Sequence, residues 1–191
     1  PEMQVASGDR GNALVLRERL LLRGYDAELT SVFAGDAVAD DLDMYVLGGN
    51  PSAMQYLAAA QLHRDRGLAR AVERGAPVLA VRAGAAILGS WCESDRGERH
   101  SGAGLLDVTT TATAILGRSR GDRGRIPLRD VVGTPLPVEL GRAVIGVYSE
   151  GRRMFRGDGA APFMKLLSPD LDGLDGEEGA IQGSIIATGL Q

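Results

Sequence analysis

The stretch that decides the fold is "GAPVLAVRAGAAILGSW", residues 75–91, an apolar run interrupted by one charged residue. Residues 76–81 have the composition of a buried strand, and the apolar residues after Gly84 follow a helical spacing. A strand that turns sharply into a helix is the arrangement that exposes a nucleophile in many enzymes. Arg82 stands at this turn, and its guanidinium stays protonated at physiological pH. The sequence therefore predicts a strand, a tight turn and a helix, with a permanent cation at the turn.

The segments before this unit alternate between helix and strand patterns. Residues 12–25 fit an amphipathic helix that ends at Gly24, and residues 43–49 fit a buried parallel strand that ends in a glycine pair. The other predicted elements are a short strand over residues 26–32 and two helical pieces over 51–75 that meet near Arg66. This alternation predicts an α/β fold, a mainly parallel sheet with helices on both faces.

The C-terminal half, from about residue 105 to 188, has a different pattern and is expected to be rich in β-strands and long loops. Residues 105–116 contain many threonines and β-branched residues. Residues 126–140 contain prolines that suit edge strands or turns, and residues 181–188 fit an inner strand.

Length and composition limit the classes of function. The chain has 191 residues, 44% of them hydrophobic and 24% charged, which predicts a single folded domain over 1–191. The net charge is −4 and the basic residues are scattered, so no nucleic-acid partner is expected. No apolar run reaches the roughly 18 to 20 residues that cross a bilayer, and no signal peptide is visible. We therefore expect a cytoplasmic protein without membrane insertion.

Cysteine and histidine are rare in this chain. One cysteine excludes an internal disulfide, and Cys92 with two histidines gives no zinc-ligand spacing. The sequence therefore predicts neither a metal site nor a cofactor.

A family resemblance is carried by five segments in a fixed order. They are "SGDRGNALVLRERLLLRG" (7–24), "DMYVLGGNPSAMQ" (43–55), "RGAPVLAVRAGAAILGSW" (74–91), "GAGLLDVTT" (102–110) and "EGAIQGSIIAT" (178–188). Together they resemble class I glutamine amidotransferase domains of the CobB/CobQ-like type, in particular GatD-like glutaminase subunits of lipid II isoglutaminyl synthase. The resemblance covers nearly the whole chain and implies that it lacks the family's first strand and last helix.

The chain departs from this family where the family carries its chemistry. Relatives have Cys-Ala-Gly-Tyr-Gln or similar at the turn, whereas this chain has Arg82-Ala83-Gly84-Ala85-Ala86. A later family motif, Thr-Gly-Phe-Glu-Asn-His-Gly-Gly, is also missing from residues 145–152. Gln191 stands where relatives have the histidine that activates the cysteine. The resemblance thus implies that Arg82 at the nucleophile position and Gln191 at the base position are both inactive.

Other positions correspond to binding residues of the family. Gly48, Gly49 and Ala83 are expected to offer backbone N–H groups to an oxyanion or ligand. Arg118 corresponds to the arginine that holds the substrate carboxylate, although a two-residue offset makes Arg120 a competitor, and a solvated loop position stays open for both.

The remaining candidate catalytic groups are expected to be inert. Cys92 lies ten residues beyond Arg82, about 15 Å along a helix, whereas attack requires atoms about 3 to 3.5 Å apart. We expect Cys92 to be a small buried side chain. His63, in a polar helical stretch, and His100, in a charged loop, are both expected to be solvated surface groups.

Arg82 itself has two interpretations. In the structural one, its long side chain fills an unused cavity and pairs with a carboxylate such as Glu150 or with loop carbonyls. In the functional one, its charge recruits a small carboxylate or phosphate to an altered pocket.

Three functions follow from these observations. The favoured one is a degenerate amidotransferase-like pseudoenzyme that serves as structural or regulatory partner, in a heterodimer, of a Mur-ligase-like (MurT-type) ATP-dependent amide-forming enzyme. The second is a working glutaminase subunit that supplies ammonia for amidation of a cell-wall precursor or related carboxylate. The third is a repurposed anion-binding pocket.

Overall fold

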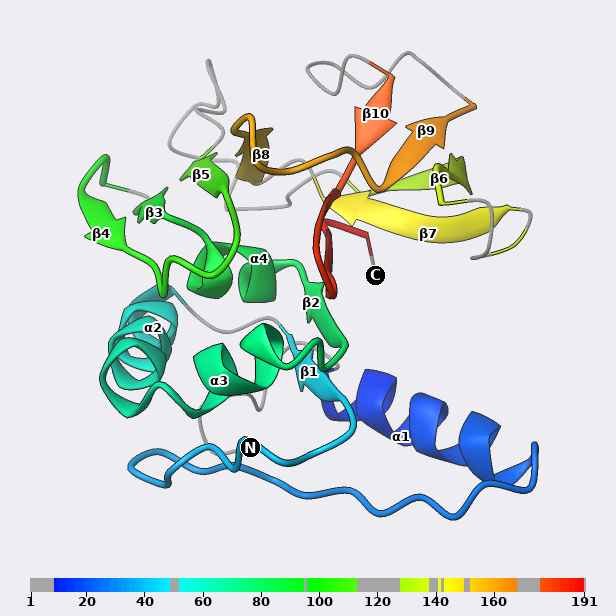
Figure 1. The fold of residues 1–191 in the computed structure, drawn as a ribbon. Helices are drawn as coiled ribbons and strands as arrows, with labels where there is room; N and C mark the ends of the chain where they lie inside the picture. Colours follow the sequence, from blue (N-terminus) through cyan, green and yellow to red (C-terminus); the bar gives the residue numbers. More distant parts are fainter. Residues whose placement is uncertain are drawn as a thin grey trace, which may run out of the picture.

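A central four-stranded sheet organises the chain in the computed structural model, which describes residues 9–48, 52–94, 96–112, 128–137, 141, 143–149, 152–167 and 176–190 (Figure 1). Its strand order is β1-β2-β12-β11. The strands are β1 (Tyr45–Leu47), β2 (Val78–Val81), β12 (Ile185–Thr188) and β11 (Ala180–Gln182). β1, β2 and β12 are parallel, and β11 forms an antiparallel hairpin with β12.

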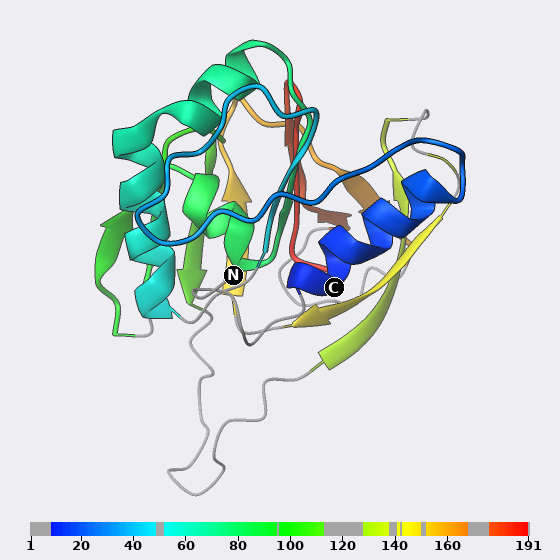
Figure 2. The same ribbon diagram turned by 90° about the horizontal axis from the view of Figure 1, so that it is seen from below.

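Helices lie on both sides of this sheet, as the sequence predicts. They are α1 (Asp9–Leu21), α2 (Ser52–Asp65), α3 (Gly67–Glu73) and α4 (Ala83–Leu88). Figures 1 and 2 show α1 on one side of the central sheet and α2, α3 and α4 on the other. All six residues of α4 are buried, because this helix contacts the central sheet and also β3 and β5 of another sheet. The strand beside it has an unbroken apolar sequence because both of its faces are covered.

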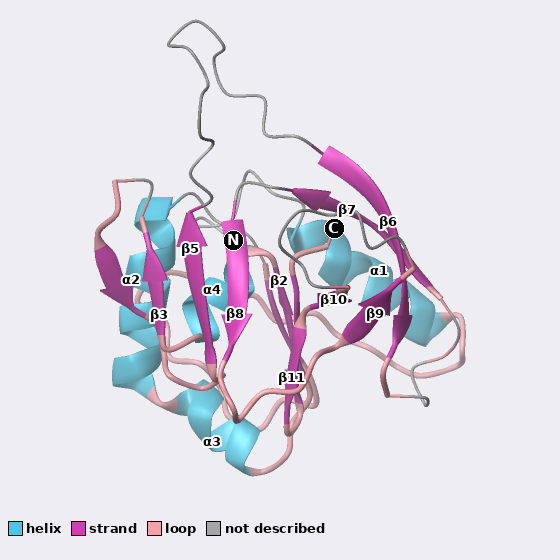
Figure 3. Ribbon diagram, turned by 90° about the horizontal axis from the view of Figure 1, so that it is seen from above, coloured by secondary structure: helices cyan, strands magenta, loops and turns pink. Residues whose placement is uncertain are grey.

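Two further sheets flank this core. The second sheet, with order β10-β9-β6-β7, consists of β10 (Glu177–Glu178), β9 (Met164–Leu166), β6 (Leu128–Pro135) and β7 (Val144–Ser149). The third sheet, with order β4-β3-β5-β8, consists of β4 (Arg99–Ser101), β3 (Trp91–Glu93), β5 (Val108–Ala112) and β8 (Arg152–Arg156). Figure 3 shows α2 and α4 behind the third sheet. The central sheet is mainly parallel, as the sequence predicts, whereas the second sheet is antiparallel and the third is mixed, so the fold is α/β with mixed sheets.

The predicted strand over residues 26–32 is wrong. This segment has no regular secondary structure. It contacts α1 through a 3.3 Å hydrogen bond that Arg17 Nε donates to the Ala27 carbonyl oxygen.

The amphipathic pattern of α1 does not bury all of the apolar residues of this helix. Leu14, Val15 and Leu20 stay exposed although the helix ends near Gly24 as predicted.

Of the two predicted settings for the prolines in residues 126–140, edge strand or turn, Pro135 and Pro137 fit the second, at a strand end and the bend after it. β6 lies inside the second sheet, between β9 and β7. Pro135 is the last residue of β6 and Pro137 follows it, so neither removes a donor from the middle of the strand. The inner strand predicted over residues 181–188 is confirmed only for Ile185–Thr188, which form β12 between β2 and β11. The first part of that range belongs to β11 and to the turn between the two strands.

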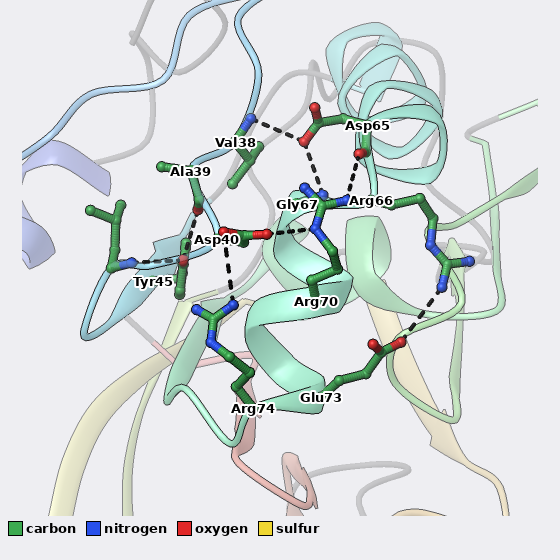
Figure 4. Close-up of polar contacts among 11 residues, drawn as sticks. Val38, Ala39, Asp40, Tyr45, Asp65, Arg66, Gly67, Arg70, Glu73 and Arg74 are labelled. Carbon is green, nitrogen blue, oxygen red and sulfur yellow. Dashed lines mark hydrogen bonds and ion pairs between the residues drawn. The ribbon is translucent and has the colours of Figure 1, made fainter.

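The break between α2 and α3 falls at Arg66, where the sequence predicts it. Arg66 has a φ of 60°, in the left-handed region, and lies between the end of α2 and the start of α3. Asp65 Oδ2 accepts the backbone N–H groups of Gly67 (3.1 Å) and Val38 (3.0 Å), as Figure 4 shows. A Cβ at position 67 would lie 1.9 Å from the Val38 carbonyl oxygen, so only glycine lets these backbones meet.

Ion pairs also connect α3 with the segment that precedes β1. Arg70 Nε donates to Asp40 Oδ2 at 2.5 Å, and Arg74 lies 3.8 Å from the other oxygen of that carboxylate (Figure 4). The hydrogen bond from Arg70 lowers the pKa of Asp40. The segment that leads into β1 is thereby fastened to α3.

We expect Asp65→Ala to lower the free energy of unfolding by about 1 to 3 kcal/mol, because it leaves the buried Val38 N–H without its acceptor. Urea denaturation followed by circular dichroism measures this loss. Glu73→Ala is the control, since it removes only an exposed 3.6 Å ion pair with Arg66 and should cost no more than about 0.5 kcal/mol. Equal losses of unfolding free energy in both variants would contradict the role of Asp65 as acceptor of the Val38 N–H.

Candidate functional site

Arg82 forms a strained elbow between β2 and α4. Its φ is 55° and its ψ is −110°. Among the described residues other than glycine, only Arg66 and Arg82 have a positive φ. Such a conformation costs a side-chain-bearing residue about 1 to 3 kcal/mol and persists only where the surrounding structure enforces it. The predicted tight turn is therefore present, and its backbone has the geometry that projects a residue from the end of a strand.

Two neighbouring strands enforce this elbow. The Arg82 N–H donates to the Thr188 carbonyl oxygen at 2.6 Å, which extends the pairing of β2 with β12 by one residue. Gly84 packs against the end of β1, where a Cβ would lie 2.5 Å from the Leu47 carbonyl oxygen. The carboxyl ends of β1, β2 and β12 thus meet at Arg82, the edge where open α/β sheets bind ligands.

The predicted site residues are only partly placed by the structure. Gly48 directly follows β1, at the same sheet edge as the elbow, and Ala83 is the buried first residue of α4. The Arg82 side chain is half-buried. Gly49, Arg118 and Gln191 lie outside the described residues, as do Arg120 and Glu150. Their assignment to a site stays a prediction.

Cys92 is buried as predicted, but it lies on a strand and not on a helix. α4 ends at Leu88, and Cys92 is the middle residue of β3, with 2% of its surface exposed. Burial raises the pKa of its thiol, more than the nearby Arg152 lowers it. Because the thiolate is the reactive form, this environment makes Cys92 a poor nucleophile.

The two histidines differ from each other. His63 is exposed on α2, as predicted. The prediction of a solvated loop position for His100 is wrong, because it lies in β4 and its ring stacks on Tyr56 with centroids 3.6 Å apart. The pairing of β4 with β3 places His100 opposite Cys92, an arrangement that the charged local sequence does not indicate.

A buried carboxylate behind the elbow was not predicted. Glu178, in β10, is 2% exposed. Its Oε2 accepts the Thr188 hydroxyl at 2.8 Å and its Oε1 accepts the Gly189 N–H at 2.5 Å. In sequence, Glu177 and Glu178 look like a solvated acidic pair. Only the pairing of β10 with β9 and the turn after β12 reveal that one of them is buried.

Burial raises the pKa of Glu178 above 4.5, and this effect outweighs its hydrogen bonds to Gly189 and Thr188 and the nearby charge of Arg156. The folded chain then binds the proton more tightly than the unfolded chain does. The contribution of Glu178 to stability is therefore greatest below pH 4.5 and falls as the pH rises toward the raised pKa.

We accordingly expect the stability difference between the natural chain and Glu178→Gln to shift against the natural chain as the pH rises from 4.5. Urea denaturation at a series of pH values measures it. A difference that shifts the other way would mean that the hydrogen bonds dominate over burial.

The strain at the elbow is tested by a matched pair of variants. Arg82→Gly and Arg82→Ala both remove the guanidinium, but only glycine tolerates a φ of 55° without strain. We expect Arg82→Gly to be more stable than Arg82→Ala by about 1 kcal/mol, after the greater entropy of unfolded glycine is subtracted. Thermal and urea unfolding of the two proteins measure this difference, and equal stability would argue against a strained elbow.

Among the described residues, no three His, Cys, Asp or Glu side chains are grouped so that they could hold a metal ion. None of the described helices has both the length and the apolar character needed to cross a membrane.

Comparison with known proteins places this fold in a family. The model of the CobB/CobQ-like glutamine amidotransferase domain matches residues 9–189. No curated protein sequence matches the chain.

Solved structures with a similar fold include a glutamine amidotransferase (18% identity, TM-score 0.59, 92% of this chain and 82% of that chain covered). PurLQS from Thermotoga maritima is also similar, with 17% identity, a TM-score of 0.61, and 92% of this chain and 79% of that chain covered. A glutamine amidotransferase from the same organism has 11% identity and a TM-score of 0.53, with 93% of this chain and 69% of that chain covered. These similarities extend to the fold alone, whereas the family model covers most of the sequence. The chain belongs to the CobB/CobQ-like glutamine amidotransferase domain family.

Proposed function

We propose that this chain is a GatD-like amidotransferase subunit with a degenerate active site, and that it acts as structural or regulatory partner of a Mur-ligase-like, ATP-dependent amide-forming enzyme. One observation carries the proposal. The elbow keeps its strained backbone and its close packing, yet the residue at the turn is Arg82.

The chemistry of glutamine hydrolysis supports a loss of activity. The reaction needs a nucleophile that attacks the side-chain amide, a group that moves protons, and donors for the oxyanion. A guanidinium is always protonated and offers only donors. Cys92 is buried on β3, His63 is exposed on α2, and His100 stacks on Tyr56. None of these side chains is a convincing substitute for a cysteine and a histidine at the elbow.

The retained scaffold supports a role as a binding partner. Gly84 still packs against Leu47, and Thr188 still accepts the Arg82 N–H, so the sheet edge around the turn keeps its shape. In the proposed complex the chain contributes this surface to the ligase subunit. The ligase then uses free ammonia or another amine in place of ammonia from glutamine.

Co-expression with a Mur-ligase-like protein from the same genome tests the proposal. We expect the two proteins to co-purify and the complex to hydrolyse ATP and form an amide with ammonium ions. With glutamine as the only nitrogen source we expect no product above background and no release of glutamate. Mass spectrometry after treatment with a diazo-ketone analogue of glutamine should find no adduct on the chain. Arg82→Cys is the matched variant for this labelling, because it restores a thiol at the turn.

The alternatives are separate outcomes of the same experiment. Release of ammonia from glutamine in proportion to the amount of natural chain would establish a working glutaminase and overturn the proposal. If no ligase binds, and a small carboxylate or phosphate raises the melting temperature of the natural chain but not of Arg82→Ala, the pocket has been repurposed for anion binding.

A further inference from the structure

We infer that Glu178 is the positioning residue of the elbow: its carboxylate fixes the turn at residues 188–190, and that turn fixes the backbone of Arg82. The inference concerns the chain's own geometry, and it stands whether or not the chain hydrolyses glutamine or binds a ligase.

Both oxygens of the Glu178 carboxylate accept hydrogen bonds from the turn at residues 188–190. Oε2 accepts the Thr188 hydroxyl at 2.8 Å, and Oε1 accepts the next residue's backbone N–H, that of Gly189, at 2.5 Å. Hydrogen bonds to a carboxylate are among the stronger ones in proteins. Two of them on consecutive residues fix both the position and the rotation of this short segment.

Thr188 transmits this position to the elbow. Its hydroxyl O–H donates to Glu178 and its hydroxyl oxygen accepts the Leu190 N–H at 3.1 Å, so the side chain is held from both sides. Its carbonyl oxygen accepts the Arg82 N–H at 2.6 Å. A path of two hydrogen bonds through one residue therefore leads from the buried acid to the strained backbone.

The turn has little room to move away from the carboxylate. A Cβ at Gly189 would lie 3.2 Å from Glu178 Oε1 and 3.3 Å from Tyr148 Cε2. Leu190 forms an isolated β-bridge with Tyr148 and is itself buried. The segment is therefore confined between β10 and β7.

The neighbouring acid shows that anchoring β10 does not require a buried carboxylate. Glu177 pairs with Arg156 Nη2 and stays partly exposed, and Arg156 Nη1 donates to the Gly179 carbonyl oxygen at 3.1 Å. Glu178 is instead buried, where an acid costs stability unless its hydrogen bonds compensate. Two of its hydrogen bonds go to the turn that contacts Arg82, which indicates a role at the elbow.

Amide hydrogen exchange followed by NMR at constant pH and temperature tests the inference. In Glu178→Gln we expect exchange of the Arg82, Gly189 and Leu190 amides to accelerate about tenfold or more relative to the amides of the β6–β7 ladder, which report on the second sheet. Glu177→Gln is the matched control. It removes the adjacent acid and the Arg156 pair, and it should change the Arg82 amide by less than about twofold relative to the same ladder.

Thr188→Val provides an independent readout, because it removes the hydroxyl that Glu178 binds but keeps the carbonyl oxygen that Arg82 contacts. We expect faster exchange at Arg82 in this variant, and a smaller additional acceleration when Glu178→Gln is combined with it than in the natural background.

If Arg82 exchange in Glu178→Gln changes only as much as in the β6–β7 ladder, Glu178 contributes to general stability alone and the inference is overturned. Additive effects of the two substitutions would likewise overturn the path through Thr188. Should Glu178→Gln fail to fold, Thr188→Val alone still tests the path: Arg82 exchange that changes no more than exchange in the β6–β7 ladder would overturn the inference.

Discussion

The hydrogen bond between the Arg82 amide and the Thr188 carbonyl oxygen is the constraint on which the site depends. It continues the parallel pairing of β2 and β12 past the last residue of β2, into a residue that has already left the extended conformation. The close approach of Gly84 to Leu47 fixes the other side of the turn. Together these contacts determine where a side chain at position 82 begins, whatever its chemistry.

Family membership and catalytic chemistry are therefore carried by different parts of this chain. The fold and the elbow come from backbone hydrogen bonds, glycine packing and buried apolar strands, and the family model matches residues 9–189. The chemistry would come from a few side chains at one sheet edge. A chain can keep the first set while it changes the second, and the proposed function rests on that separation.

Local sequence patterns were sufficient for the elements that surround the elbow. The apolar run of β2, the glycine after β1 and the break at Arg66 each have a physical cause within a few residues, so they could be predicted. The burial of Glu178 and the stacking of His100 on Tyr56 depend on strand pairing between distant segments, so no short sequence pattern predicts them. The strand expected over residues 26–32 is absent, because an alternating sequence pattern does not by itself provide a neighbouring strand to pair with.

The rigid placement of Gly84 against Leu47 has an evolutionary consequence. Since backbone atoms and Gly84 make the contacts that hold this turn, the side chain at position 82 can be exchanged by a single codon change without removing those contacts. Lineages that carry this elbow can therefore lose a reaction while keeping the molecule, and the altered protein stays available for selection on its contacts with other molecules.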